Sequence, residues 1–386
     1  MREGWKEVVL GEVCDVINGF AFKSKDFVKE GIPLVKIKEL KDNRLNISDC
    51  DYLPKYFVVD QKYHINKGDV VIALTGSHIT LPSSAVGRVA KSYLEETLLL
   101  NQRVGKFKVF EDKCDLDYLY FNLTSEYFFN SVGLLAKGAA NQANISAGDV
   151  KSIKINLPPL ETQKKIASIL SGYDDLIENN LKRIKLLEEM AQQTYEEWFV
   201  RMRFPGHESA TINSETGLPE GWEKVKLGDV LTLNYGKALK QENRIAGNYN
   251  VYGSSGVVGT HNNFLVEGPS LIVGRKGNVG SVYYEPNPFY PIDTVYYVTS
   301  EYSLFYLYYT IKSLSFINND AAVPGLNRDA AYFKEINLPN IDLINEFQDL
   351  CSSNYQIIFN LQNQNQRLRE ARDILLPRLM MGMIEV

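Results

Sequence analysis

The most constraining feature of this 386-residue chain is a long internal repeat. Residues 4–13, GWKEVVLGEV, return as residues 221–230, GWEKVKLGDV, and the segment INLP occurs at both 155–158 and 336–339. A pattern Gly-x-Ala-x-Lys follows the opening of each copy. Matching segments this far apart predict two copies of one structural unit, and therefore two similar sites in one chain.

A helical pattern follows each INLP segment. Apolar residues are spaced alternately four and three apart, which is the 3.5-residue repeat of helices that pack as a coiled coil. The stripe positions are Ile166, Leu170, Tyr173, Ile177, Asn180, Ile184, Leu187, Ala191, Thr194 and Trp198 in the first copy, and Phe347, Cys351, Asn354, Ile358, Leu361, Asn365, Leu368, Arg372, Leu375 and Leu379 in the second. Pro377 is expected to break or kink the second helix near its end.

Neither helix can bury its stripe alone, so each needs a partner. Because a globular segment lies between the two helices, we expect them to pack on each other in antiparallel orientation; a parallel homodimeric coiled coil is the alternative. The segment 375–384 would then lie against the first globular domain, and 194–199 against the second.

The expected fold class is α/β (mixed α+β), with two globular domains separated by two long antiparallel coiled-coil helices and related by a pseudo-two-fold repeat. The expected boundaries are 1–158 for the first domain, 159–204 for the first helix, 205–339 for the second domain, and 340–386 for the second helix and tail. Residues 69–74 and 270–273 read as buried strands. Residues 117–123 and 303–309 read as equivalent core helices.

Charge and cysteine content limit the functional classes. The net charge is −5, with 21 Lys and Arg against 20 Asp and Glu in residues 1–160, and 10 against 13 in residues 206–340. Binding to nucleic acid would therefore depend on local basic loops and on basic partner subunits. Four scattered cysteines indicate free thiols, and neither a signal peptide nor a long apolar run is present, so a cytoplasmic protein is expected.

Polar loops at matching places in the two copies are the candidate recognition elements. Arg, Lys, Asn and Gln on loops can hydrogen-bond to base edges and phosphates, although solvated turn chemistry explains any single residue equally simply. The candidate DNA-binding residues are Lys23, Thr75, Ser77, His78, Arg88, Lys137, Asn141 and Gln142 in the first domain, and Lys237, Lys240, Arg275, Lys276, Asn278, Asn327 and Arg328 in the second.

Catalytic and metal-binding patterns are absent from the sequence. There is no phosphate-binding loop of the Gly-x-x-x-x-Gly-Lys-Ser/Thr type and no His-Glu-x-x-His. Four histidines show no ligand spacing, and residues 274–280 lack the start of a dinucleotide fingerprint. Residues 287–290, NPFY, differ by one residue from a motif of adenine methyltransferases and are interpreted as a turn. No catalytic residue, metal ligand or cofactor site is predicted.

Three segments together resemble the specificity subunits of type I restriction–modification systems. They are the Gly-Trp-x-x-x-x-Leu-Gly-Glu/Asp-Val opening, residues 155–170 (INLPPLETQKKIASIL), and the ending 375–384 (LLPRLMMGMI). The resemblance covers essentially the whole chain and both repeats. The second copy departs from it at residues 340–344, NIDLI, which lack the Pro-Pro and Gln of the first copy.

The resemblance implies a function for each part. Each globular domain would be a target recognition domain that reads one half of a bipartite site in double-stranded DNA, and the helices would set the spacer. Two modification (methyltransferase) subunits would dock on the helices, and restriction (motor) subunits would join them. S-adenosylmethionine, ATP and Mg²⁺ would then belong to those partners, and no membrane would be involved. The alternatives are the recognition half of a fused restriction–methylation enzyme and a scaffold that does not bind DNA.

Overall fold

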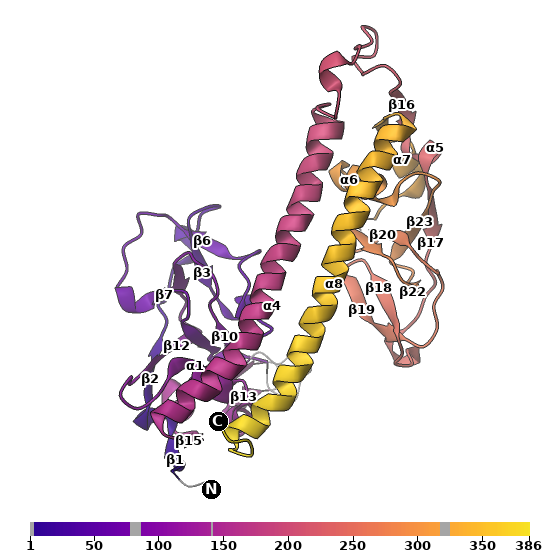
Figure 1. Ribbon diagram of the computed structural model, residues 1–386. Coiled ribbons are helices and arrows are strands. Elements are labelled where there is room, and N and C mark those ends of the chain that lie inside the picture. Colours follow the sequence, from indigo (N-terminus) through magenta and orange to yellow (C-terminus); the bar gives the residue numbers. More distant parts are fainter. Residues whose placement is uncertain (1–3, 78–85, 140–141, 317–324) are drawn as a thin grey trace. The chain divides into compact units, whose positions relative to one another are not determined.

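The computed structural model describes residues 4–77, 86–139, 142–316 and 325–386 of the chain. The chain divides into two compact units, the first made of Met1–Leu181 and Gln362–Val386, the second of Lys182–Leu361. Two long helices, α4 (Leu160–Tyr195) and α8 (Ile341–Met380), each contribute one end to each unit. Each unit therefore holds one globular domain together with parts of both helices (Figure 1).

The first domain is built mainly from short strands. A six-stranded sheet has the order β2-β12-β8-β10-β5-β4, a four-stranded sheet the order β6-β3-β11-β7, and a three-stranded ribbon the order β13-β14-β9. The strands are β1 (Lys6–Val9), β2 (Cys14–Asn18), β3 (Ile32–Val35), β4 (Leu40–Lys41), β5 (Arg44–Leu45), β6 (Asp51–Leu53), β7 (His64–Ile65), β8 (Val70–Ala73), β9 (Thr75–Gly76), β10 (Val89–Lys91), β11 (Leu98–Leu100), β12 (Val104–Val109), β13 (Lys137–Ala139), β14 (Gln142–Asn144) and β15 (Lys154–Leu157). The helices are α1 (Leu116–Leu123), α2 (Glu126–Leu135) and α3 (Ala147–Lys151).

The second domain repeats this plan with fewer described strands. A four-stranded sheet has the order β17-β23-β20-β21, and a three-stranded sheet the order β19-β18-β22. The strands are β16 (Glu223–Lys226), β17 (Thr232–Tyr235), β18 (Tyr249–Gly253), β19 (Gly256–His261), β20 (Ser270–Gly274), β21 (Val282–Glu285), β22 (Phe289–Pro291), β23 (Val295–Thr299) and β24 (Glu335–Leu338). The helices are α5 (Leu227–Val230), α6 (Leu304–Ser313) and α7 (Arg328–Tyr332). The predicted strands and core helices of both domains are confirmed as β8, β20, α1 and α6.

The repeated landmarks pair with each other inside each unit. The opening strand β1 pairs antiparallel with β15, with Val8 opposite Ile155, and β16 pairs with β24 in the same way, with Val225 opposite Ile336. In both copies a core-helix tyrosine then donates its hydroxyl to the backbone of the INLP segment. The two conserved ends of each copy therefore close its domain at the start of the long helix.

Close backbone approach explains the glycine of the Gly-x-Ala-x-Lys pattern. A Cβ atom added to Gly19 would lie 2.1 Å from the carbonyl oxygen of Asn101, and one added to Gly236 would lie 2.1 Å from that of Ile292. Real Cβ atoms do not make contacts this short, because the overlap would force the backbone apart. Gly19 directly follows β2, and Gly236 directly follows β17, the strand that ends in Tyr235.

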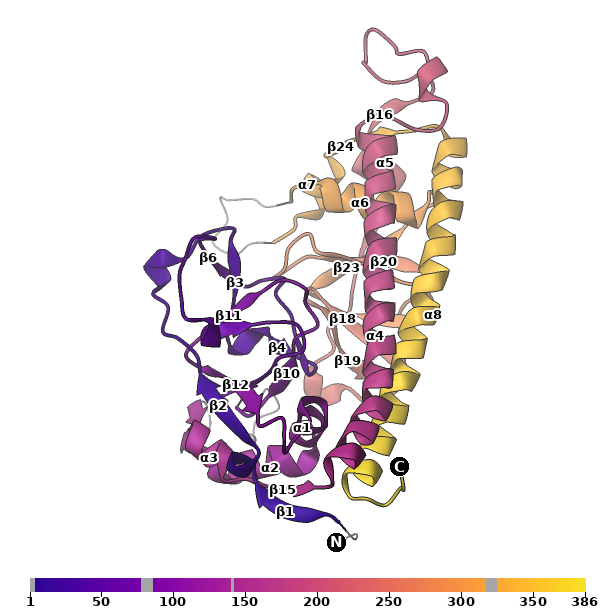
Figure 2. The same cartoon turned by 60° about the vertical axis from the view of Figure 1, so that its left-hand side comes forward.

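The helices α4 and α8 pack on each other in antiparallel orientation, as predicted, and lie side by side in both views (Figures 1 and 2). In the first unit, Asn180 of α4 hydrogen-bonds to Asn365 of α8 over 3.0 Å. In the second unit, Ile184 packs with Ile358 and Leu361. Residue numbers therefore increase along α4 in the direction in which they decrease along α8, as in an antiparallel pair.

Most stripe positions are buried as predicted. Among them are Ile166, Leu170, Ile177, Asn180, Ile184 and Ala191 on α4, and Phe347, Cys351, Asn354, Ile358, Leu361, Asn365 and Leu379 on α8. The end of α4 differs, because Tyr195 and Phe199 are buried where Thr194 and Trp198 were expected. A π-helical turn, Glu196–Val200, follows α4 here.

The helix ends differ in their chemistry. At the start of α4, Gln163 is fully buried and accepts a hydrogen bond from the backbone N–H of Asp115. In the second copy, Gln348 of α8 accepts a hydrogen bond from the hydroxyl of Ser303, which caps α6, and the Asn340 side chain caps α8 by accepting from the N–H of Leu343. The expectation that Pro377 breaks α8 is wrong, since the helix continues to Met380. Proline removes one backbone donor, and the helix keeps one further turn beyond it, in which the N–H of Met381 donates to the carbonyl of Pro377.

The predicted docking of the helix ends is confirmed. Leu379 and Met380 belong to the core of the first domain, and Leu375 and Ile384 pack against it. Tyr195 and Phe199 belong to the core of the second domain. No helix in the described part of the chain is long and apolar enough to cross a membrane.

Candidate nucleic-acid interface

Two arginines and a tyrosine form a compact group in the second domain, which we call the arginine–tyrosine cluster: Tyr235, Arg275 and Arg328. Tyr235 ends β17, Arg275 follows β20 directly, and Arg328 starts α7. The guanidinium carbons lie 4.9 Å (Arg275) and 5.2 Å (Arg328) from the centre of the Tyr235 ring. These distances are within the range of cation–π attraction, which orients a guanidinium without neutralising it.

The strand register fixes Arg275. Its backbone N–H donates to the carbonyl of Thr294 over 2.9 Å, and its carbonyl accepts from Leu326 over 2.8 Å. Its Nη1 donates to the carbonyl of Asp293 over 3.0 Å. The head group is therefore anchored on one edge, while its other donors remain for a ligand.

A buried tyrosine, Tyr296, packs against the tyrosine of the cluster. Tyr296 is 1% exposed, its ring centre lies 5.0 Å from that of Tyr235, and its hydroxyl donates to the carbonyl of Leu326 over 3.1 Å. Burial raises the pKa of Tyr296 to about 12, so this hydroxyl stays protonated and keeps the bond. Tyr235 itself is 49% exposed and presents its ring to solvent.

The cluster is electrostatically unbalanced. Within the described residues, none of Lys237, Arg275, Lys276 and Arg328 forms an ion pair, and the Nε of Arg328 is buried without a hydrogen-bond partner. The two arginines of the cluster, and Lys237 and Lys276 of the same domain, therefore lack carboxylate partners in the described part of a domain where Asp and Glu outnumber Lys and Arg. Such a group attracts an anion or the acceptor edge of a base.

The other candidates of the second domain differ in how free their side chains are to contact a ligand. Lys276 is exposed and pairs through its backbone with Gly325, and Asn278 is exposed at the tip of the loop after β20. Asn327 caps α7, because its side-chain oxygen accepts from the N–H of Ala330 over 3.0 Å. Lys240 is exposed and lies 3.7 Å from Glu242.

The first domain presents a polar ribbon at the matching place. Strands β9, β13 and β14 bring Thr75, Lys137 and Gln142 onto one small sheet, where Thr75 donates its hydroxyl to Oδ1 of Asn144 over 2.9 Å. The expectation that Lys137 and Gln142 lie on a loop is wrong, because both start strands of this sheet. Alternate residues of a two-stranded ribbon face the same side, so the pairing orders these side chains.

Arg88 and Lys23 of the first domain lie on other elements than this ribbon. Arg88 lines a cleft of about 370 Å³ with Lys41 and Asp42, at the β4–β5 hairpin. Lys23 is exposed at the start of a short 3-10 helix, and Ser77 follows β9. His78 and Asn141 lie outside the described residues.

The two domains carry different side chains on the same backbone frame. Leu74 and Arg275 occupy equivalent positions in the two domains. In each case the backbone carbonyl accepts a hydrogen bond from the N–H of the residue directly before a helix N-cap residue. Sheet register likewise matches Asn18 with Tyr235, and the helix starts match Ala147 with Arg328. The cluster of the second domain thus has no counterpart at these positions in the first.

Sequence reasoning missed Tyr235. The residue directly precedes the repeated glycine at 236, and an aromatic residue at the border of a landmark was the available signal. Asn144 was missed as well, although it belongs to the same polar segment as Gln142. Among the described residues, no three His, Cys, Asp or Glu side chains group in a way that could hold a metal ion.

These features define a class of protein: a duplicated α/β domain on a paired-helix frame, with a different polar surface on each copy. A family model described as the type I restriction modification DNA specificity domain matches residues 2–189 and 219–349. The chain belongs to this family.

Individual relatives agree with this assignment. A specificity subunit named for the type I restriction enzyme MjaX of Methanocaldococcus jannaschii is 30% identical, over 74% of this chain and 62% of the relative. The MjaIX specificity subunit of the same organism is 25% identical, over 70% of this chain and 69% of the relative. The chain therefore spans less than two thirds of the length of the first of these relatives.

A solved structure shares the fold. The S subunit of a type I restriction–modification system from M. genitalium superposes with a TM-score of 0.58 at 17% sequence identity. The match covers 97% of this chain and 96% of that one. This agreement at low identity supports the duplicated architecture of domains and long helices.

Proposed function

We propose that the chain is the DNA sequence-specificity subunit of a type I restriction–modification complex, in which each domain reads one half of a bipartite DNA target. The observation that carries this proposal is the pair of equivalent backbone frames with different polar side chains. A duplicated reader with identical surfaces would select a symmetric site, whereas different surfaces select two different half-sites.

The arginine–tyrosine cluster supplies the chemistry for the second half-site. Arginine reads guanine through its O6 and N7 acceptors and also contacts phosphates, and an aromatic support keeps the guanidinium in one orientation. The ribbon of Thr75, Lys137 and Gln142 supplies hydroxyl, ammonium and amide groups for the first half-site. Gln can read adenine in the same bidentate manner, so the two surfaces suit different bases.

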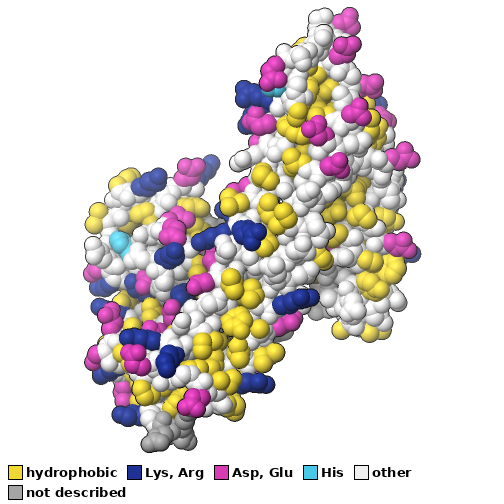
Figure 3. Space-filling view, viewed as in Figure 1, with side chains coloured by type: hydrophobic (Ala, Val, Ile, Leu, Met, Phe, Trp, Pro, Cys, Tyr) yellow, Lys and Arg dark blue, Asp and Glu magenta, His cyan; other side chains and the backbone are white. Residues whose placement is uncertain are grey.

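The long helices carry a second apolar stripe that the seam does not use. Ile169, Leu176 and Met190 on α4 are between 41% and 53% exposed, and Ile357 on α8 is 41% exposed. Each of them lies one residue before a seam position, so Ile169 and Leu176 in the first unit, and Met190 and Ile357 in the second, lie beside the seam. Figure 3 shows apolar side chains along both helices on the face in view.

We assign this stripe to the docking of modification subunits, because exposed apolar strips on helices mark protein interfaces. S-adenosylmethionine, ATP and Mg²⁺ are then held by the modification and restriction subunits, and the present chain contributes recognition and no catalytic group. The helices also set the spacer between the half-sites in this scheme.

Methylation mapping tests the proposal. Cells that express this chain with the modification subunit of the same system should carry methylated adenines in a split target, with two short specified parts around unspecified bases. A continuous methylated target would contradict the two-reader scheme. Binding of S-adenosylmethionine by the purified chain alone would favour a fused-enzyme origin, and a complex that ignores DNA would favour a scaffold.

A further inference from the structure

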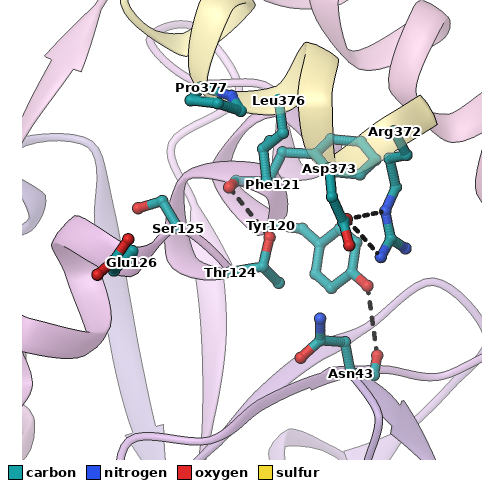
Figure 4. A pocket seen from close by; sticks show the side chains of 10 residues that line it. All are labelled: Asn43, Tyr120, Phe121, Thr124, Ser125, Glu126, Arg372, Asp373, Leu376 and Pro377. Carbon is teal, nitrogen blue, oxygen red and sulfur yellow. Dashed lines mark hydrogen bonds and ion pairs between the residues drawn. The ribbon is translucent and has the colours of Figure 1, made fainter. Parts of the chain in front are cut away.

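Two clefts occupy the same position in the two units. The first, of about 310 Å³, lies between α8 and the α1–α2 turn of the first unit (Figure 4). The second, of about 550 Å³, lies between α4 and α6 of the second unit. Each cleft therefore forms where the core helix of a domain meets the end of a long helix.

Five residues that line the first cleft correspond, through the sequence repeat, to five residues that line the second. The cleft of the first unit is lined by Tyr120, Phe121, Thr124, Asp373 and Pro377, and the corresponding residues Tyr308, Tyr309, Lys312, Gln192 and Glu196 line the cleft of the second unit. The core-helix match follows from the tyrosine hydroxyls that bond to the INLP segments, and the long-helix match from the spacing of those segments. Most of the matched side chains differ in charge or size between the two copies, yet both copies have a cleft at this position.

Both clefts carry more carboxylates than cations. The first has Glu126 and Asp373 against Arg372, and that arginine is already bound to Asp373 and to the buried Asp174. In Figure 4 the Arg372 head group points toward Asp373 and away from Glu126 at the other end of the cleft. The free negative charge therefore lies on the side formed by α2.

The lining of the second cleft also has more carboxylates than cations, supplied by other residues. Glu188, Glu189 and Glu196 line it against Lys312, whose Nζ lies 4.9 Å from the ring centre of Tyr308. Desolvation raises the pKa of Glu188, which disfavours its charged form until a cation approaches. Aromatic walls next to carboxylates suit an arginine or lysine side chain, since the charge finds a carboxylate and the stem finds a ring.

We propose that these paired clefts are the docking sites for two copies of one protein, each of which inserts a positively charged segment. The negative lining excludes DNA as the occupant, because phosphates would be repelled. A partner that binds twice needs one site in each unit, and the repeat places the clefts accordingly. The inference deepens the proposed docking of modification subunits and rests on it.

Charge reversal tests the clefts one at a time. Glu126→Lys changes the first cleft and Glu188→Lys the second, and neither carboxylate forms an ion pair within the described residues. Native mass spectrometry and titration with the purified modification subunit of the same system would count bound copies per full-length chain. We expect each single variant to weaken one copy at least tenfold, and the double variant to weaken both, because like charges across an interface are costly.

Matched controls separate docking from folding. Glu111→Lys and Glu301→Lys place the same charge on exposed turns before α1 and α6, and should leave two copies bound. Glu126→Gln and Glu188→Gln remove charge without adding bulk and should give intermediate losses with an unchanged unfolding midpoint. If the double reversal binds two copies with wild-type affinity, the cleft inference is wrong and the proposed function stands. If the unaltered chain binds no modification subunit, the docking part of the proposed function fails with it.

Discussion

Asn180 donates a hydrogen bond from its Nδ2 to Oδ1 of Asn365 over 3.0 Å, and both amides are buried between α4 and α8. Counted from the INLP segment of each copy, Asn180 corresponds to Leu361, and Asn365 corresponds to Ile184. Leu361 and Ile184 pack on each other in the second unit. The helix pair therefore has a polar layer in the first unit, and the second unit has an apolar layer at the position related by the repeat.

Replacing one member of this layer should destabilise the helix pair. Asn180→Leu leaves the buried Asn365 amide without its partner, which costs about 1–3 kcal/mol. The double variant Asn180→Leu/Asn365→Ile copies the apolar layer of the second unit and should recover most of that loss. Urea unfolding followed by circular dichroism measures both. A double variant less stable than the single one would contradict the equivalence of the layers.

A buried ion pair should be indispensable to the first unit. Asp174 on α4 is 2% exposed and is bound to Arg372 on α8, and the hydroxyl of Tyr93 lies 3.4 Å from the same carboxylate. Arg372→Met leaves this carboxylate buried and unpaired, at a cost of about 3–5 kcal/mol.

The same substitution at an exposed arginine of α8, Arg369→Met, serves as the control for the ion pair. It should change the unfolding midpoint little, because an exposed side chain away from the seam contributes little to stability. Equal losses in the Arg369→Met and Arg372→Met variants would show that the ion pair has no special role.

Two glycines should respond in opposite directions to alanine. Gly19→Ala directs a Cβ atom to 2.1 Å from a backbone oxygen, so the backbone after β2 must move and the variant should be destabilised. Gly172→Ala, within α4, meets no atom within 4 Å and should stabilise the chain by about 0.5–1 kcal/mol through helix propensity. Thermal unfolding of both variants checks the contrast, and a stabilised Gly19→Ala would contradict the close approach.

Cysteine reactivity should follow burial. Burial raises the pKa of Cys14, Cys114 and Cys351 to about 12, whereas Cys50 is only partly buried, although burial raises its pKa as well. Because the thiolate is the reactive form and its fraction rises with pH toward the pKa, the three buried thiols should resist a thiol reagent from pH 7 to 9.

The expected result is one faster-reacting thiol in the folded chain and four in urea. Cys50→Ser should remove the faster phase. Rapid labelling that persists in the Cys50→Ser variant would show that another cysteine is accessible.

Local sequence patterns could predict the frame of the molecule. The repeat and the 3.5-residue stripes indicated two domains and paired helices, and Asn180 stood out as a polar stripe position. The contact of Gln348 with Ser303 could not be foreseen, because this glutamine stands four residues further along its helix than the position that corresponds to Gln163. Lys137 and Gln142 were read as a loop, since Gly, Ala and Asn dominate their segment and tertiary pairing overrides that preference.

The site itself was harder to predict than the frame. Tyr235, Arg275 and Arg328 lie far apart in the sequence and meet only through the register of β17, β23 and β20. A pattern of isolated arginines gives no information on which of them share an aromatic support. The equivalence of the two clefts was also hidden, because four of the five matched positions carry different side chains in the two copies.

The most direct test of two separate readers is methylation mapping of the Arg275→Ala/Arg328→Ala variant beside the unaltered chain, each expressed with the modification subunit of the same system. The account predicts a split adenine target for the unaltered chain. In the variant, one part of that target should lose definition or methylation should fall at least tenfold, and the other part should keep its sequence. Loss of definition in both parts, or an unchanged target at full methylation, would contradict the assignment of the second half-site to this cluster.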